Sequence, residues 1–333
     1  MLRSAARDGT SWRARSVATE PLAKSGSAVP RVSVLLPVFN AEAYVGDAVR
    51  SILTQTFTDF ELIVIDDGST DASPRILADL ARGDARVHLR VRPNQGNIAT
   101  LNESIDMARG EYFARMDHDD IALPQRFARQ VEFLDAHPEV VAAGSRALFI
   151  DDEGLPLMEV MDHYSHEQID RALMTPELGV IHPSVMMRAD ACRAIGGYRA
   201  EYPHAEDLDF FLRLGEVGRL ENIAEPLLQY RTHASSVSFR YRETQSRSAR
   251  KAVEAALARR GVSPESVTIA GLPGGRGETP SELHSKWGWW ALEAGHLRTA
   301  RKHARLALFA EPLSLSNHKL VACVIRDSLK SLR

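Results

Sequence analysis

The sequence is poor in cysteine, lacks long apolar runs and carries no excess of positive charge. Its two cysteines, Cys192 and Cys323, cannot form a disulfide framework, so a reducing cytoplasm is the expected environment. No apolar run reaches the roughly 18 residues of a membrane-spanning helix, so any contact with a membrane is expected to be peripheral. The formal net charge of −3 argues against a nucleic-acid-binding protein, which would be broadly basic.

The 333 residues have an ordinary globular composition, 44% hydrophobic and 26% charged, which suits one large or two medium domains. Residues 1–30 are rich in Arg, Ser and Ala and lack the apolar region of a secretory signal. We interpret them as a disordered tail, although their composition also resembles a transit peptide. We expect a globular domain over residues 31–238, followed by a helical extension over residues 239–333.

Short apolar, β-branched runs alternate with segments of helical periodicity in the first half of the chain. The expected strands are 31–39, 60–65, 87–91, 111–116 and 140–144. Strands and helices that alternate at this spacing indicate right-handed βαβ units, and therefore an α/β fold with a Rossmann-like, mostly parallel sheet flanked by helices.

Polar and acidic segments follow three of these strands. They read "PVFN", "DDGSTD" and "DHDD", and the carboxyl ends of parallel strands meet at one edge of a sheet, where ligands bind. The last segment places three carboxylates, Asp117, Asp119 and Asp120, within four positions. Such close like charges repel each other unless a cation offsets them. The segment is therefore either a solvated turn or a cation-binding site.

Five segments resemble, in this order, the family 2 glycosyltransferases of the GT-A fold. They read "SVLLPVFNAEAYVGDAVRSILTQTF", "ELIVIDDGSTD", "NQGNIATLN", "GEYFARMDHDDIALPQRF" and "EDLDFFLRL". The resemblance spans residues 31–233. It implies an inverting enzyme that transfers a sugar from a nucleotide-sugar donor with the help of Mn²⁺ or Mg²⁺. Residues 31–145 would then form the nucleotide-binding half and residues 146–238 the acceptor half.

The resemblance also implies roles for residues of the nucleotide-binding half. Asp119 is the implied metal ligand, and Asp117 is implied to contact the metal or the ribose. A divalent cation would stabilise the negative charge that develops on the departing nucleoside diphosphate. Asp67 is implied to bind the base, and Pro37 and Phe39 to line its pocket.

The remaining implied roles fall on a loop and on a helix start. Asn94 and Gly96 match the loop that closes over the donor, and Leu101 stands where related enzymes often carry an arginine. Asp207 is the implied catalytic base, because inversion in one displacement needs a group that removes the proton of the acceptor hydroxyl. Glu206 lies beside it and is expected to bind the substrate, by orienting the acceptor, or to orient the start of the helix. Asp209 is a rival for the role of the base.

Several residues leave two interpretations open. His182 and His233 can join the site, or they can be ordinary surface or hydrogen-bonded histidines. Trp287, Trp289 and Trp290 can form a platform for sugars or the core of a helical hairpin that turns at Gly295. From residue 283 to 333 the chain has nine Lys and Arg against three Asp and Glu, so this basic hairpin is a candidate for peripheral membrane contact.

The expected donor is a UDP-sugar, and the expected acceptor is a lipid-linked glycan in the synthesis of cell-surface polysaccharide, on the inner face of the cytoplasmic membrane. The chain lacks the Q-x-x-R-W motif of processive synthases, which favours the addition of one sugar at a time. A non-catalytic nucleotide-sugar-binding scaffold is an alternative. A sugar-phosphate nucleotidyltransferase would favour a Gly-rich loop with a basic residue near its N-terminus, which "LLPVFNAEAY" does not provide.

Overall fold

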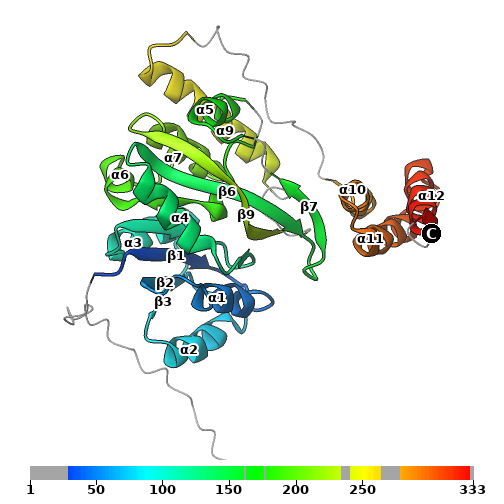
Figure 1. The fold of residues 1–333 in the computed structure, drawn as a ribbon, viewed down its shortest axis with the longest axis horizontal. Coiled ribbons are helices and arrows are strands. Elements are labelled where there is room, and N and C mark those ends of the chain that lie inside the picture. Colours follow the sequence, from blue (N-terminus) through cyan, green and yellow to red (C-terminus); the bar gives the residue numbers. More distant parts are fainter. Residues whose placement is uncertain (1–28, 161–162, 176–177, 234–240, 264–277, 331–333) are drawn as a thin grey trace, which may run out of the picture.

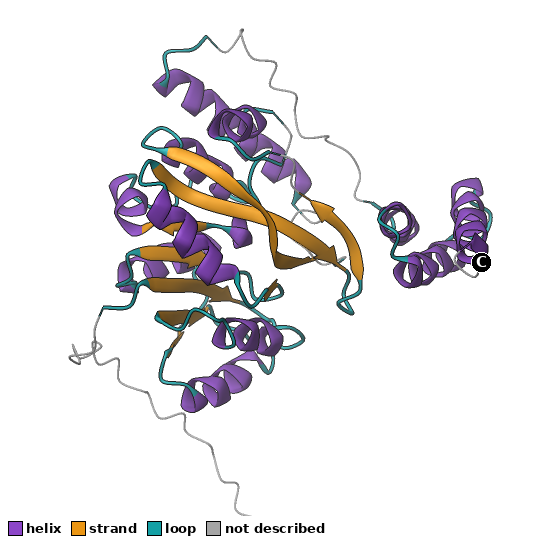
Figure 2. Ribbon diagram, in the orientation of Figure 1, coloured by secondary structure: helices purple, strands orange, loops and turns teal. Residues whose placement is uncertain are grey.

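The computed structural model describes residues 29–160, 163–175, 178–233, 241–263 and 278–330. The predicted tail lies mostly outside these residues. The described strands form one sheet in the order β3-β2-β1-β4-β8-β6-β9-β5, and β7 pairs with β6 on the side (Figure 1). Helices lie along both faces of this sheet (Figure 2), so the predicted α/β architecture is confirmed.

The first half of the sheet is parallel throughout. Strand β1 (Val32–Val38) pairs with β2 (Phe60–Asp66) and with β4 (Tyr112–Arg115), and β2 pairs with β3 (Val87–Val91). The intervening helices are α1 (Val45–Leu53), α2 (Ser73–Gly83) and α3 (Asn97–Met107). Every residue of β1 and β2 is buried, as expected where helices cover both faces of a parallel sheet.

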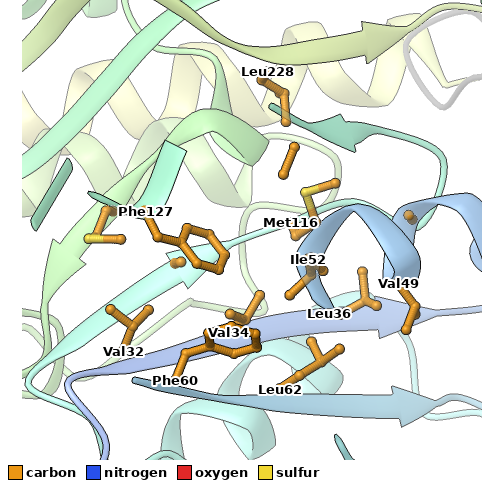
Figure 3. Packing of buried hydrophobic residues seen from close by; sticks show 14 of the residues in the cluster. Val32, Val34, Leu36, Val49, Ile52, Phe60, Leu62, Met116, Phe127 and Leu228 are labelled. Atoms are coloured by element: carbon orange, nitrogen blue, oxygen red, sulfur yellow. The ribbon is translucent and has the colours of Figure 1, made fainter. Parts of the chain in front are cut away.

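Alternate residues of β1 enter two different hydrophobic cores. Val34 and Leu36 pack with Ile52 of α1 and Phe127 of α4 (Arg126–Ala136) on one face (Figure 3). Leu35 points to the other face, where the core includes α3 and α7 (Glu206–Leu214). This alternation is the two-residue period of a strand, and it fixes the register of the sheet.

The second half of the sheet is more mixed than the first. Its strands are β5 (Ile121–Ala122), β6 (Val140–Ile150), β7 (Pro156–Val160), β8 (Met186–Arg188) and β9 (Arg219–Arg231). Strand β8 is antiparallel to β4 and β6, whereas β9 is parallel to β6. The predicted strand at 140–144 is the start of the longer β6. A 3₁₀ turn (His182–Ser184) comes just before β8.

Two short helices, α5 (His166–Leu173) and α6 (Ala189–Ala194), complete the second half of the sheet domain. Helix α9 (Arg242–Arg259) buries Ala252 and Val253 in the same core as Phe210 of α7. The predicted division of the chain into domains stays a prediction.

Three helices form the C-terminal part: α10 (Pro280–Glu293), α11 (Leu297–Ala310) and α12 (Leu315–Lys330). The first two make the predicted hairpin, and Gly295 supplies its turn with a φ of +81°. Trp287 is only 3% exposed and packs in a core that includes Leu320 of α12 and Leu157 of β7, so the core interpretation of this tryptophan is confirmed. Among the described residues no helix is both long and apolar enough to cross a bilayer.

Candidate active site

The acidic turn between β4 and β5 lies at the carboxyl end of the parallel strands. Asp117 forms an ion pair of 2.5 Å with Arg115, whose side chain is fully buried at the end of β4. Asp120 is also buried and accepts a hydrogen bond of 2.8 Å from the backbone N–H of Arg231, while its Oδ2 has no partner. Burial and the negative charges of Asp119 and Asp117 raise the pKa of Asp120 well above its usual value. The turn thus concentrates negative charge that its neighbours only partly offset.

The fold brings His233 from the end of β9 to Asp119. The distance between His233 Nε2 and Asp119 Oδ2 is 3.0 Å, and the His233 ring also stacks on Tyr44. Burial alone would raise the pKa of Asp119, but the hydrogen bond with His233 and the charge of His118 hold it below its usual value. The sequence left open whether His182 and His233 join the site, and the structure places His233 next to Asp119 of the acidic turn.

The donor atoms of this turn suit a small divalent cation. Mg²⁺ and Mn²⁺ prefer carboxylate oxygens, and Mg²⁺ usually takes only one or two protein carboxylates beside water and substrate phosphates. In the described part of the chain no group of three His, Cys, Asp or Glu side chains is arranged to hold an ion by itself. Asp119, with the unpartnered buried oxygen of Asp120 beside it, fits an ion whose other ligands come from a diphosphate.

Asp67 ties the end of β2 to the loop before α3. Its carboxylate accepts hydrogen bonds from the backbone N–H groups of Gln95 (2.9 Å) and Gly96 (2.8 Å). It also pairs with Arg92 at 2.5 Å, and both side chains are largely buried. Gly68 makes this approach possible, because a Cβ at this position would lie 2.6 Å from the backbone nitrogen of Asn94. A carboxylate has about four acceptor positions, so Asp67 retains room for a further donor.

The other residues that the resemblance implied for the nucleotide pocket differ in exposure. Phe39 is 47% exposed and Asn94 is exposed, so both are accessible to a ligand. Pro37 is buried within β1, opposite Ile65 of β2, and can support a pocket only from beneath. Gly96 has a φ of +90°, a conformation that favours glycine, and directly precedes α3.

Arg92 is a residue that the sequence analysis missed. It is 8% exposed, and besides Asp67 it binds Glu103 at 2.8 Å and the hydroxyl of Thr100 at 2.8 Å. It places a cation beside the first turns of α3, the helix that carries Leu101. A signal was present in the sequence, because Arg92 directly follows the third strand and so had to lie near the same edge of the sheet.

Asp207 occupies the first turn of α7 with its neighbour Glu206. Burial and the negative charge of Glu206 raise the pKa of Asp207 to about 7, and Asp117 acts in the same direction. The backbone N–H of Leu208 donates to Asp207 at 2.8 Å. A carboxyl group with such a pKa can take up a proton near neutral pH, as a general base must.

Asp209 is placed differently from its neighbours. It is 0% exposed, and its carboxylate binds Arg213 one turn later in α7 at 2.7 Å. Arg213 also donates to the carbonyl oxygens of Ile195 and Gly197. Asp209 therefore belongs to a buried ion pair inside the domain, which argues against the rival assignment of the base.

A cavity of about 530 Å³ lies between the start of α3 and the segment before α7. Its lining includes Asn97, Asn102, Tyr198, His204 and Glu206. Glu206 Oε1 accepts a hydrogen bond of 2.9 Å from Asn97, whereas its Oε2 is buried without a partner. The cavity thus combines a mostly apolar lining with a few polar groups, among them Asn97 and Glu206, which is typical of a ligand site.

His182 supports this cavity from the interior. Its Nε2 lies 2.8 Å from the hydroxyl oxygen of Tyr198, and burial together with the charge of Arg115 lowers the pKa of His182 well below its usual value. A partly buried ring that binds the hydroxyl of Tyr198 fits the interpretation of His182 as an ordinary hydrogen-bonded histidine.

Solved structures share this fold at low sequence identity. S. aureus TarS, residues 1–349, superposes with a TM-score of 0.55 at 18% identity, over 87% of this chain and 77% of that chain. The mannosyltransferase PcManGT from Pyrobaculum calidifontis, in complex with GDP-Man and Mn²⁺, superposes with a TM-score of 0.53 at 18% identity, over 91% and 81% of the two chains. These likenesses show that the chain has the GT-A fold.

Sequence comparison gives the family. Residues 33–196 match the model described as "Glycosyl transferase family 2". An uncharacterized glycosyltransferase of Haemophilus influenzae is 33% identical over 233 residues, 67% of this chain and 72% of that protein. The putative glycosyltransferase EpsE of Bacillus subtilis is 33% identical over 218 residues, 64% of this chain and 76% of EpsE. The chain belongs to glycosyl transferase family 2, so the predicted family and enzyme class are confirmed.

Proposed function

We propose that this glycosyltransferase is metal-dependent and inverting, and that it moves one sugar at a time from a nucleotide sugar to an acceptor hydroxyl. The observation that carries the proposal is the pairing of two features in one site. An acidic turn suited to a divalent cation lies near a carboxyl group whose pKa is about 7, close enough for the charge of Asp117 to influence Asp207. The acidic turn would hold a cation that stabilises the departing nucleoside diphosphate, and the carboxyl group of Asp207 would accept the proton of the attacking hydroxyl.

In the donor half, Asp119 would hold Mn²⁺ or Mg²⁺, with Asp117 contacting the ion or the ribose. Such an ion stabilises negative charge on a departing nucleoside diphosphate. Asp67, Phe39 and Asn94 would bind the base, supported by Pro37 and Gly96. A UDP-sugar is the expected donor. PcManGT, which shares the fold, was solved with GDP-Man and Mn²⁺, so GDP-sugars belong in the same test.

In the acceptor half, Asp207 would remove the proton of the acceptor hydroxyl as its oxygen attacks C1 of the sugar. The bond from C1 to the diphosphate oxygen breaks in the same step, and the configuration at C1 inverts. The unpartnered Oε2 of Glu206 would accept a hydrogen bond from a sugar hydroxyl in the neighbouring cavity. Glu206 is therefore proposed to orient the substrate rather than to take its proton.

The biological setting that we propose is the synthesis of cell-surface polysaccharide on a lipid-linked acceptor. A further relative, the chondroitin synthase of Escherichia coli, is 28% identical over 236 residues, which are 70% of this chain and 34% of that protein. Its name gives a polysaccharide product. A glycan acceptor would suit the cavity that is lined in part by Asn97 and Glu206.

We also propose that the C-terminal helices contact the surface of an anionic membrane. Phe309, Leu313 and Leu315 lie at or near the turn between α11 and α12, and they are 87%, 92% and 85% exposed. Residues 297–330 contain seven Lys and Arg but only two Asp and Glu. Exposed apolar side chains beside an excess of positive charge match a bilayer with anionic headgroups.

A screen of nucleotide sugars tests the proposed function. The protein is heated with each UDP- and GDP-sugar in the presence of Mn²⁺, and its melting temperature is compared with that in excess chelator. We expect one nucleotide class to raise the melting temperature only when Mn²⁺ is present, since a ligand that binds the folded state stabilises it. Stabilisation by none of them would contradict the proposal.

A further inference from the structure

Arg231, the last residue of β9, joins the acidic turn to the loop that follows β6. Its backbone N–H donates to Asp120 Oδ1 and its Nε donates to the carbonyl oxygen of Asp119, both at 2.8 Å. On its other side, Nη1 donates to the carbonyl oxygens of Asp151 and Asp152, both at 3.1 Å. The residue is 5% exposed. One buried guanidinium group therefore fixes the acidic turn relative to this loop.

The loop after β6 is organised by the side chain of Asp151. Its Oδ1 accepts hydrogen bonds from the backbone N–H groups of Glu153 (3.0 Å) and Leu155 (2.8 Å). Gly154 completes the turn with a φ of +83°. The second oxygen, Oδ2, is left to bind groups outside the loop.

Those groups come from helix α11, about 150 residues further along the chain. Lys302 Nζ lies 2.8 Å from Asp151 Oδ2, 3.0 Å from Asp152 Oδ1 and 3.1 Å from Glu153 Oε1. His303 Nε2 lies 3.1 Å from the same oxygen of Asp151, and both of these residues are 0% exposed. Burial alone would raise the pKa of Asp151, but the hydrogen bonds from His303 and Lys302 hold it below its usual value.

The orientation of His303 is fixed from a second helix. Because the ionised carboxylate of Asp151 only accepts hydrogen bonds, His303 Nε2 must donate. The other ring nitrogen of His303, Nδ1, lies 3.1 Å from Nδ1 of His284 in α10. Helices α10 and α11 together therefore hold the side chain of Asp151.

We propose that Lys302 and His303 are positioning residues for the acidic turn. Helix α11 holds the loop after β6, this loop holds Arg231, and Arg231 holds Asp119 and Asp120 in the shape that binds a divalent cation. The inference rests on the proposed metal-binding role of Asp119. Groups that orient a metal ligand without touching the ion typically change metal affinity by about 10- to 100-fold. The C-terminal helices would thus support the active site as well as contact a membrane.

The affinity of the protein for Mn²⁺ tests this positioning role directly, because its measurement does not require turnover. Electron paramagnetic resonance measures the concentration of free Mn²⁺ during a titration. The titration contains UDP or GDP, whichever of the two makes the unaltered protein bind Mn²⁺ more tightly. Lys302→Met removes the charge but keeps the apolar stem, and we expect Mn²⁺ to bind about three- to tenfold more weakly. Lys302→Arg keeps a cation and should restore most of the affinity.

Lys286→Met is the matched control. Lys286 lies in neighbouring helix α10, pairs with Glu278 at 3.2 Å and lies over the ring of Trp290, but neither of these partners contacts Asp151. Its Mn²⁺ affinity should equal that of the unaltered protein. An equal loss in both methionine variants, or no loss in Lys302→Met, would overturn the inference. Absence of Mn²⁺ binding by the unaltered protein would instead refute the metal site itself, and this inference with it.

Hydrogen–deuterium exchange gives a second readout. If Lys302 only stabilised the C-terminal helices, its replacement would not change amide exchange in the acidic turn. In Lys302→Met, amide exchange should become faster in the peptide that covers residues 117–122, while the peptide of α2 (73–83) stays as protected as before. Faster exchange confined to α10–α12 would overturn the inference. Should Lys302→Met not fold, Asp152→Asn weakens the same contact at a half-exposed side chain and is expected to show the same change to a smaller degree.

Discussion

Replacement of Asp207 by asparagine separates catalysis from stability at the proposed base. Asn keeps the size of the side chain and an oxygen that can accept from Leu208, but it cannot take up a proton. We expect sugar transfer to fall by about 10²- to 10⁴-fold, the usual contribution of a positioned general base. Nucleotide affinity should change only a few-fold, because the nucleotide is proposed to bind at Asp67 and Asp119.

The same variant should be more stable than the unaltered protein at alkaline pH. The pKa of Asp207 is about 7 in the folded protein, against an ordinary value of 3.8. Between these two values the folded protein keeps a proton that the unfolded chain has lost, so stability decreases as the pH rises from about 4 to 7. One pKa unit corresponds to about 1.4 kcal/mol, which limits the effect to about 4 kcal/mol.

Solvent and a rearrangement of Glu206 reduce the cost of ionising Asp207 in the folded protein. We therefore expect Asp207→Asn to increase the free energy of unfolding at pH 8 by about 1–2 kcal/mol. This corresponds to a rise of about 2–8 °C in melting temperature. At pH 5 the gain should be smaller. Thermal denaturation at both pH values measures it, and the transfer rate of the unaltered enzyme should fall as the pH drops below about 7. Normal transfer by Asp207→Asn, or a loss of stability at pH 8, would refute the assignment.

Three further outcomes follow from the site and the C-terminal helices. Glu206→Gln should reduce transfer less than Asp207→Asn and mainly raise the KM of the acceptor; a loss as large as that of Asp207→Asn would contradict the orienting role. Asp209→Asn leaves the buried charge of Arg213 without its partner, so it should lower the free energy of unfolding in urea by about 3–5 kcal/mol. The folded variant should keep its turnover. Lost turnover at normal stability would instead support Asp209 as the base. The protein should sediment with anionic liposomes at low salt but not at high salt, and the pair Leu313→Ser and Leu315→Ser should weaken this, whereas Val217→Ser at another exposed apolar position should not.

The α/β part of the fold could be predicted because each element there carries a local signal. Strands such as β1 and β2 are buried on both faces and therefore read as continuous apolar runs, and the helices between them show a clear apolar stripe. Local signals do not reveal which strands pair with each other in the second half of the sheet. The antiparallel insertion of β8 between β4 and β6 depends on contacts far apart in the sequence.

For the candidate site, the sequence pointed to acidic residues and missed the arginines that hold them. Asp67, Asp119 and Asp207 stand in recognisable segments at strand or helix ends, and the fold brings Asp207 close enough to the acidic turn for the charge of Asp117 to act on it. Arg92 directly follows β3 and Arg231 ends β9, but neither stands in a recognisable motif, and a single arginine at the end of a strand usually faces solvent. Only the fold shows that both are buried and joined to aspartates.

The C-terminal helices show the same limit. The hairpin of α10 and α11 was predictable from its periodicity and from Gly295, but α12 was not recognised as a separate helix. The contact of Lys302 with Asp151 joins residues about 150 positions apart, and neither residue stands in a motif. Pairings of this kind arise from packing and cannot be deduced from local sequence.

Metal dependence of nucleotide binding is the most direct test of the central claim, that the acidic turn uses a divalent cation to bind a nucleotide-sugar donor. UDP and GDP are titrated into the unaltered protein and into Asp119→Asn by calorimetry, first with Mn²⁺ and then with excess chelator. The account predicts that Mn²⁺ tightens the binding of one nucleotide by about tenfold or more, and that Asp119→Asn loses this gain while remaining folded. Equal affinity with Mn²⁺ and with chelator would contradict the claim.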